Sequence, residues 1–222
     1  VDDKPVLGGG VHQLAGVEDL APRDWVASEA RAIEDAGGRI LTATTAFGIF
    51  DHRMVGLVQN GPFGTAPRLH RMRAARIILA TGALDRPVTF ASNDLPGVML
   101  ASAVRDYAVN WGVSCGDRTV IVTNNDDAYR TAIALKQAGL EVPAILDARP
   151  DPQGDLIDQA RGLGIRVEVG RGVASLTGKG RVQGVQVCLH AGEGAVVEAI
   201  PCEAVAMSGG WSPVVHLWSH CG

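Results

Sequence analysis

Three segments of the chain share one local pattern, in which a helical stretch ends at a glycine and a β-rich run follows. The segments are IEDAGGRILTATT, LKQAGLEVPAIL and ARGLGIRVEVG, with Gly37, Gly139 and Gly164 at the junctions. Glycine readily adopts the left-handed conformation that ends a helix, and the Ile, Leu and Val that follow favour a strand. Helices and strands that alternate at this spacing predict βαβ units and a parallel sheet. The predicted fold class is therefore α/β.

The remaining elements follow from apolar periodicity and from Gly and Pro punctuation. Helices are expected over residues 22–36 and 100–111 and within DPQGDLIDQARGLG. The stretch from HRMVGLVQN to RLHRMR predicts two antiparallel strands, and RIILATG predicts a strand buried on both faces. GRVQGVQVCLHAGEGAVVEAIPCEAVAMSGG predicts a hairpin and a final buried strand, after which Pro213 is placed to open a helix.

Charge and cysteine usage exclude several classes of protein. A net charge of −4 gives no general affinity for nucleic acid or an anionic membrane, and no apolar run approaches the ~20 residues that span a bilayer. The four cysteines are scattered, which predicts buried, reduced thiols in a cytoplasmic protein. His216 and His220 stand four residues apart but lack a third ligand at a suitable spacing, so no metal site is predicted.

Several strand ends carry small or acidic residues. Thr81 and Gly82 end RIILATG, and Gly209 follows AVAMS. Open α/β sheets bind ligands at the carboxyl edge of their strands, where such residues allow close backbone approach. The carboxylate of Asp2 or Asp3 could accept hydrogen bonds from a ribose, although these residues alone favour the interpretation of a frayed polar terminus.

One βα turn has the outline of a dinucleotide site without its chemistry. In VIVTNNDDAYRTA, residues 124–127 stand where glycines would bring the backbone to a pyrophosphate. A carboxylate stabilises the positive end of a helix dipole and repels the phosphates that this end attracts. We therefore predict a structural turn in which Asn125 or Asp126 caps the helix.

The segments LATGALDRPVTFASNDLPGVMLASAVRDYAVNWGV, VTNNDDAYRTA and AMSGGWSPVVHLWSHCG resemble the α subunits of heterotetrameric sarcosine oxidase. The related α-type subunits of proline dehydrogenase, opine oxidase and hydrogen cyanide synthase share parts of this pattern. The resemblance implies two Rossmann-like dinucleotide-binding domains of the glutathione-reductase-like FAD/NAD(P)-binding type. The Gly-rich fingerprint of the first domain has no counterpart here, so that domain is expected to be incomplete and the chain to be an internal fragment.

The same resemblance implies domains, ligands and partners. Residues 1–90 with 203–222 would form the partial NAD-binding domain, and residues 91–202 the second, degenerate one. The residues expected to border the NAD are Asp2 and Asp3 at the ribose, Lys4 and Gly10 beside the adenine and pyrophosphate, Ala46 at the adenine, and Thr81 and Gly82. The parent enzyme would hold FAD, FMN and tetrahydrofolate and would assemble with β, γ and δ subunits.

The function implied is oxidative demethylation of sarcosine to glycine, with formaldehyde or methylene-tetrahydrofolate and hydrogen peroxide as products. No catalytic residue is expected within these 222 residues, and NAD is expected to bind the isolated chain weakly or not at all. Exposed apolar surface would favour self-association. Two alternatives remain: a subunit of an opine or proline dehydrogenase or another FAD/NAD(P)-dependent oxidoreductase, and a non-catalytic nucleotide-binding scaffold.

Overall fold

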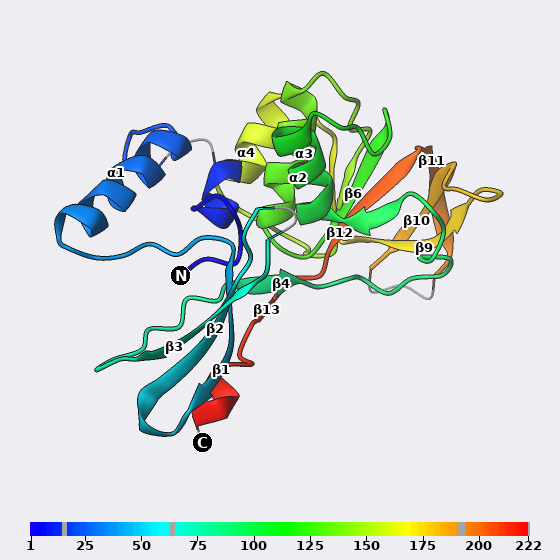
Figure 1. Ribbon diagram of the computed structural model, residues 1–222. Coiled ribbons are helices and arrows are strands. Elements are labelled where there is room, and N and C mark those ends of the chain that lie inside the picture. Colours follow the sequence, from blue (N-terminus) through cyan, green and yellow to red (C-terminus); the bar gives the residue numbers. More distant parts are fainter. Residues whose placement is uncertain (15–16, 63–64, 191–193, 222) are drawn as a thin grey trace. The chain divides into compact units, whose positions relative to one another are not determined.

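The computed structural model describes residues 1–14, 17–62, 65–190 and 194–221 (Figure 1). The chain divides into two compact units, Val1–Ala83 with Pro213–Gly222, and Leu84–Ser212. The nucleotide-binding domains expected from the sequence have other bounds, residues 1–90 with 203–222 and residues 91–202. The strand β12 (Ala204–Ser208) falls in the second compact unit because it pairs with β5 (Val98–Leu100) and β6 (Thr119–Thr123), which both belong to that unit.

The second unit is built on a five-stranded sheet in the order β5-β12-β6-β7-β8, where β7 is Ile145–Asp147 and β8 is Val167–Val169. All neighbouring strands in this sheet are parallel. The helices α2 (Ala101–Trp111), α3 (Asp127–Gln137) and α4 (Asp155–Gly162) precede or connect these strands. The predicted α/β class and the helix near residues 100–111 are thereby confirmed.

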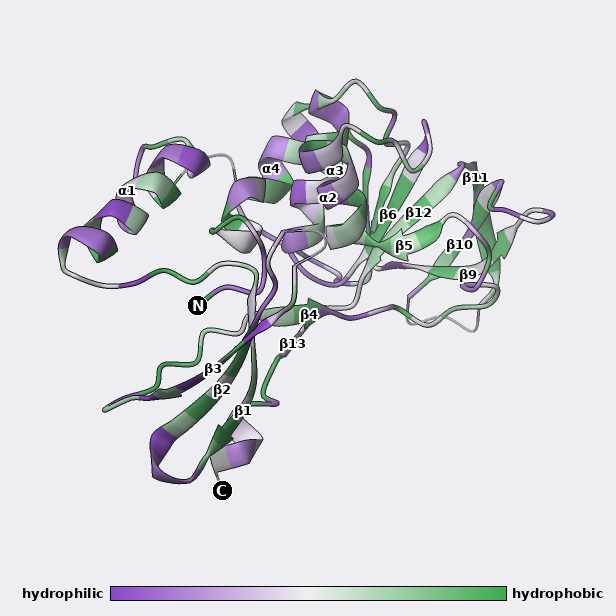
Figure 2. Cartoon of the chain, in the orientation of Figure 1, coloured by the Kyte–Doolittle hydropathy of each residue, from purple (hydrophilic) through white to green (hydrophobic). Residues whose placement is uncertain are grey.

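Alternate residues of the central strand β6 enter two different cores. Ile121 packs in the cluster formed with the helices, which includes Tyr129 and Ile157. Val120 and Val122 pack in the other cluster, on the side of an antiparallel sheet made of β9 (Arg171–Thr177), β10 (Gly184–Leu189) and β11 (Val196–Pro201). Successive side chains of a strand point to opposite faces, so five consecutive buried residues in β6 require cover on both sides. Figure 2 shows the hydrophobic character of β6 and β12 between these layers.

The glycines that defined the sequence pattern end helices as predicted. Gly37, Gly139 and Gly164 have φ angles of 78°, 82° and 75°, in the left-handed region. The backbone N–H groups of Gly139 and Gly164 donate to Lys136 and Arg161 in the last turns of α3 and α4. A Cβ atom at these φ angles would strain the backbone, which explains why glycine stands there.

The first unit contains α1 (Pro22–Asp35) and a three-stranded antiparallel sheet in the order β1-β2-β3. The strands are β1 (Thr44–Phe50), β2 (Met54–Gln59) and β3 (Arg68–Arg73), and short 3-10 helices cover Gly9–Gln13 (η1), Asp51–Arg53 (η2) and Trp218–Cys221 (η3). The predicted antiparallel strands and the first helix are confirmed. Among the described residues of this unit, Ile49 and Leu57 are the only buried hydrophobic side chains, and α1 buries none.

Two predicted elements are wrong. RIILATG forms no strand before β4 (Ala83–Asp85), and Ile78 is 90% exposed. An apolar run becomes a strand only where neighbouring strands complete its ladder, and no described strand flanks residues 76–82. The helix expected at Pro213 is absent as well, because residues 211–213 form β13 (Trp211–Pro213), which pairs with β4.

None of the described helices combines the length and the apolar character needed to cross a membrane.

Candidate nucleotide-binding sites

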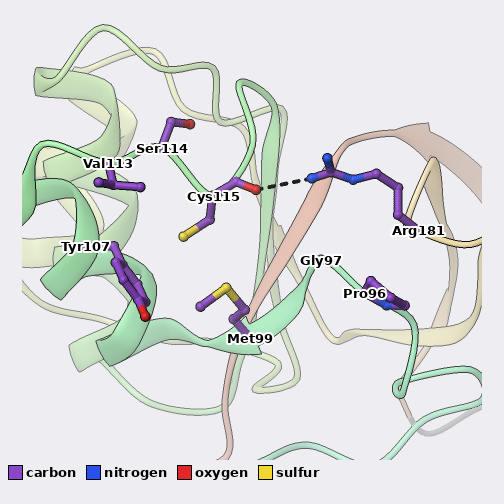
Figure 3. A pocket seen from close by; sticks show the side chains of 8 residues that line it. All are labelled: Pro96, Gly97, Met99, Tyr107, Val113, Ser114, Cys115 and Arg181. Atoms are coloured by element: carbon purple, nitrogen blue, oxygen red, sulfur yellow. Dashed lines mark hydrogen bonds between the residues drawn. The ribbon is translucent and has the colours of Figure 1, made fainter.

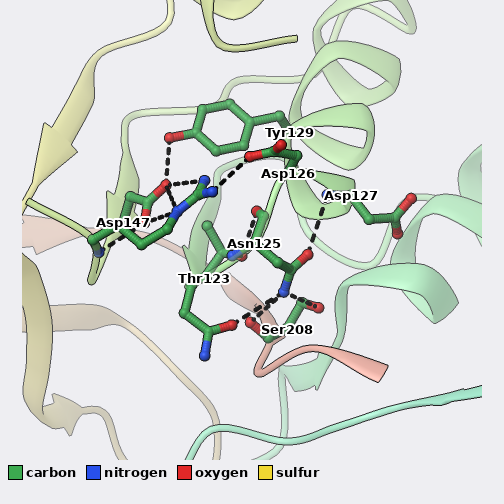
Figure 4. Close-up of polar contacts among 9 residues, drawn as sticks. Thr123, Asn125, Asp126, Asp127, Tyr129, Asp147 and Ser208 are labelled. Atoms are coloured by element: carbon green, nitrogen blue, oxygen red, sulfur yellow. Dashed lines mark hydrogen bonds and ion pairs between the residues drawn. The ribbon is translucent and has the colours of Figure 1, made fainter. Parts of the chain in front are cut away.

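The turn between β6 and α3 is closed by its own side chains (Figure 4). The Oδ1 atom of Asn125 accepts a hydrogen bond from the backbone N–H of Asp127 at 3.1 Å, which caps α3. Its Nδ2 atom donates to the backbone oxygen of Ser208 at 3.2 Å and to the Ser208 hydroxyl at 3.0 Å. The predicted cap is confirmed at Asn125, whereas the Asp126 side chain makes no capping hydrogen bond. Asn125 therefore ties the ends of β6 and β12 together across the place where a pyrophosphate would lie.

The two aspartates of the turn are each paired with an arginine. The Arg105 guanidinium, which is buried, donates to the Asp127 carboxylate at 3.0 Å and 3.3 Å and to its backbone oxygen. Arg149 contacts Asp126 at 2.7 Å. These two carboxylates and their arginines occupy the N-terminus of α3, which is the place where a bound phosphate would lie in a dinucleotide site.

Asp147, at the end of β7, is fully buried and its hydrogen-bonding capacity is used internally. It accepts from the Tyr129 hydroxyl at 2.8 Å, from the Arg149 backbone at 2.9 Å and from the Arg149 guanidinium at 2.7 Å. Burial, followed by the hydrogen bond to Asp147 and its charge, raises the pKa of Tyr129 well above its usual value. The hydrogen bond to Asp147 likewise raises the pKa of Arg149. In a Rossmann unit the acidic residue at this strand end, about 20 residues beyond the glycine turn, binds a ribose.

A second helix of the same sheet also has a carboxylate at its N-terminus. Asp85, in β4, accepts from the backbone N–H of Ser102 in the first turn of α2 at 3.2 Å. It also accepts from the Ser208 hydroxyl at 2.7 Å, which joins it to the Asn125 network. The N-termini of α2 and α3 therefore each receive a hydrogen bond from a side chain of the protein itself.

Sequence reasoning identified the turn but missed Asp85, Asp147 and Arg149. Asp147 was recognisable in principle, because it ends the apolar run AIL at the interval that a Rossmann unit uses for its acidic residue. The other two were not, since their roles depend on contacts between segments that the fold brings together.

Gly209 allows a close approach, but its neighbour is the protein's own backbone. Its N–H donates to Arg86 at 2.7 Å, and a Cβ atom there would lie 2.9 Å from the Pro87 carbonyl oxygen. This explains the glycine without a ligand.

In the first unit, the segment that begins the chain runs beside the segment that leads into β1. The backbone N–H of Asp2 donates to Leu41 at 2.9 Å, and Lys4 accepts from Ala43 at 2.8 Å. One carboxylate oxygen of Asp2 accepts from the Lys4 backbone at 2.9 Å. Asp3 is exposed and makes no hydrogen bond or ion pair with a described residue, so its carboxylate is free to receive ribose hydroxyls.

The other predicted NAD contacts of this unit fall into two groups. Thr81 and Gly82 lie together beside Val214: the Thr81 hydroxyl donates to the Val214 oxygen at 2.5 Å, and Gly82 accepts from the Val214 N–H at 3.0 Å. Gly82 has a φ angle of 71° and open space around its Cα. Gly10 lies in η1, and Ala46 lies in the edge strand β1. No hydrogen bond between described residues joins these positions to Asp2 or Asp3.

A shallow hollow of about 410 Å³ lies elsewhere in the second unit (Figure 3). Met99, Tyr107, Val113 and Cys115 give it an apolar wall, and Arg181 stands at its rim. The Arg181 guanidinium donates to the Cys115 carbonyl oxygen at 3.4 Å. Burial raises the pKa of the Cys115 thiol, so it is a poor nucleophile.

The described cysteines are structural in character. Cys188 and Cys202 are buried as predicted, and Cys115 is half-buried; the side chain of Cys221 lies outside the described residues. Burial raises the pKa of Cys202 to about 11. Among the described residues, no three His, Cys, Asp or Glu side chains gather into a group that could hold a metal ion, and His220 instead accepts from the Ile49 N–H at 3.4 Å.

Comparison with solved structures defines the class of fold. The chain is similar to T. acidophilum thioredoxin reductase, with a TM-score of 0.69 and 14% identity over 97% of this chain and 69% of that one. It is also similar to the L-proline dehydrogenase of P. horikoshii, with a TM-score of 0.62 and 21% identity over 100% of this chain and 38% of that one. The fold is that of FAD/NAD(P)-binding oxidoreductases, as predicted.

Comparison of sequences gives the particular relatives. The chain is homologous over its whole length to part of sarcosine oxidase subunit alpha, with 35% identity to the Rhizobium meliloti (strain 1021) protein and 34% to that of Corynebacterium sp. (strain P-1). The matched region spans 100% and 99% of this chain, respectively, but only 23% and 24% of those proteins. No protein-family model matches the chain. The resemblance noted from the sequence is confirmed, and the chain spans about a quarter of the length of these relatives.

Proposed function

We propose that the chain is the NAD-binding portion of the alpha subunit of a multisubunit sarcosine oxidase. The observation that carries this proposal is the 35% identity along the entire chain to proteins named sarcosine oxidase subunit alpha. The parent complex would oxidise sarcosine to glycine and yield hydrogen peroxide, together with formaldehyde or methylene-tetrahydrofolate. This portion would hold NAD, while the FAD, FMN and tetrahydrofolate sites would belong to other parts of the complex.

The two units differ in how well their residues fit NAD. In the second unit Asn125, Asp126 and Asp147 are engaged by Ser208 and Arg149, so a pyrophosphate or ribose would have to displace internal partners. In the first unit Asp3 has a free carboxylate and Gly82 has open backbone around it. These residues support a site in the first unit, in which Asp3 would accept hydrogen bonds from the adenosine ribose. Bound there, NAD would be available for structural support or for hydride exchange.

Titration calorimetry with NAD on the full-length subunit tests the location of the site. Asp3→Asn is expected to weaken binding about tenfold, because a neutral amide loses one charge-assisted acceptor worth about 1.4 kcal/mol. Asn125→Ala is the matched control in the second unit and should leave the affinity within twofold. The opposite ranking would place the nucleotide at the β6–α3 turn and refute the proposal. For the chain of 222 residues on its own, weak or undetectable binding is expected, and micromolar binding would contradict that expectation.

The reaction is tested separately on the assembled complex. Oxygen consumption and peroxide formation should depend on sarcosine and not on L-proline. A complex that oxidises L-proline in place of sarcosine would support the alternative of a proline dehydrogenase subunit.

A further inference from the structure

The antiparallel sheet of the first unit has one exposed face. In the register of β1, β2 and β3, Thr44, Ile49 and Leu57 point to one side, and all three are buried. Successive residues of a strand point to opposite faces, and paired residues of neighbouring strands share a face, so the residues between these positions and their ladder partners point to the other side. By this register Phe50, Leu69, Arg71 and Arg73 share the other face. Phe47 lies at a bulge without a partner, and its ring lies over Gly56 on the same face. We call these five residues the exposed sheet face. Figure 2 shows the hydrophobic character of β1 and β2 in this sheet.

The two phenylalanines of this face are held in place by glycines. A Cβ atom at Gly56 would lie 2.5 Å from the Phe47 ring, and one at Gly48 would lie 2.8 Å from the Phe50 ring. Gly48 and Gly56 pair with each other, so the rings lie over a flat patch of backbone and meet edge to face at 6.3 Å between centroids. Phe47 and Phe50 nevertheless remain 47% and 48% exposed, and Leu69 remains 64% exposed. Ordered aromatic rings with half of their surface in solvent are typical of the centre of a protein interface.

The charge of this region is opposite to that of the chain. Residues 44–76 contain five arginines and one aspartate, a net charge of +4, whereas the whole chain has a net charge of −4. The remainder therefore carries −4 − (+4) = −8. Arg71 and Arg73 are exposed, and neither guanidinium group makes an ion pair or a hydrogen bond with a described residue. Unpaired cations around an apolar centre predict a partner with carboxylates at matching positions.

We propose that the exposed sheet face binds an acidic surface of another protein subunit. Phe47, Phe50 and Leu69 would form the apolar centre of the contact, and Arg71 and Arg73 would pair with carboxylates at its edge. A nucleic acid fits less well, because its phosphates have no use for Leu69 and the chain as a whole is anionic. The relatives are named as one subunit of an enzyme, which indicates that subunits of other kinds exist.

The test uses the full-length protein and its purified partner subunits, with affinity measured by biolayer interferometry at 50 mM and 300 mM salt. The double variant Arg71→Glu, Arg73→Glu is expected to weaken the complex at least tenfold at low salt, and the difference should narrow at high salt as screening increases. The matched control Arg23→Glu, Arg31→Glu changes the charge equally on the exposed part of α1 and should act less than twofold. Leu69→Ser is a second, uncharged variant that should also weaken binding, and circular dichroism should show all variants folded.

Photo-crosslinking from position 69 identifies what covers the face. Crosslinks to an acidic segment of a different subunit support the proposal. Crosslinks within the same chain or to a second copy of it overturn the proposal, as does a double variant that binds its partner subunits as tightly as the control. The proposal is also overturned if the double variant loses binding to an RNA oligonucleotide while its binding to the partner subunits is unchanged. Absence of sarcosine oxidation in the same complex would refute the proposed function but not this contact.

Discussion

The two units of the chain differ in how many of their hydrophobic side chains are buried and how many of their charged side chains form ion pairs. The second unit buries both faces of a parallel sheet, and all nine ion pairs found among the described residues lie within it. Among the described residues of the first unit, only the hydrophobic side chains of Ile49 and Leu57 are buried. The arginines of this unit and Asp3 make no ion pair with a described residue. In the second unit, Asn125, Asp126 and Asp147 are engaged by internal partners, whereas the side chain of Asp3 in the first unit is not. This difference is what supports the proposals of a ligand site and a partner surface in the first unit.

The strongest test of this difference is a large-to-small substitution in the core of each unit in turn. Ile145→Ala removes a fully buried side chain from the second unit and should lower its free energy of unfolding by about 2–5 kcal/mol. Leu57→Ala, at 2% exposure in the first unit, should change the stability of the second unit by less than about 0.5 kcal/mol, because Leu57 belongs to a different compact unit and shares no core cluster with β6 or β7. Urea unfolding followed by hydrogen exchange of the β6 and β7 amides measures both. An equal effect of the two variants on these amides would show that the units share one core.

The next largest effect is expected at Asp147, the strand-end carboxylate that Tyr129 and Arg149 bind in the second unit. Asp147→Ala leaves the Tyr129 hydroxyl without its partner and removes the buried half of the Arg149 contacts. We expect a loss of about 3 kcal/mol, at the lower end for a buried pair because Arg149 keeps Asp126. Asp126→Ala, the control, removes the half-exposed partner and should cost at most about 1 kcal/mol. Thermal unfolding of the two variants distinguishes them, and a reversed order would show that the turn contributes more than the buried carboxylate.

The smallest effect concerns an exposed ion pair of the second unit. Hydrogen bonds from Arg166 lower the pKa of the Glu198 carboxyl in the folded protein. A lowered folded pKa stabilises the protein above the ordinary value of 4.5, and this stabilisation is lost as the pH falls through the folded pKa. Arg166→Ala should therefore reduce stability by at most about 1 kcal/mol near pH 7 and by progressively less below pH 4.5, since both groups are well exposed to solvent. Denaturation midpoints measured from pH 3 to 7 check this, and a difference that grew in acid would contradict the assignment.

The amino-acid sequence determined those features that depend on neighbours along the chain. Gly139 and Gly164 required left-handed backbone, the alternating helices and strands required a parallel sheet, and Asn125 next to two aspartates excluded a glycine turn. Each of these follows from the conformational and electrostatic preferences of a few adjacent residues, so local reasoning reached it.

Tertiary structure decided whatever depends on which segments meet. The run RIILATG has strand-forming residues but acquires no ladder partner among the described strands, and Pro213 lies in a strand because Gly82 accepts from the residue after it. The burial of Asp147, the link from Ser208 to Asp85 and the shared face of Phe47 and Arg71 join residues distant in sequence or depend on strand register. Burial and ion pairing depend on contacts between segments that are distant in sequence, and the tertiary fold determines which segments come into contact.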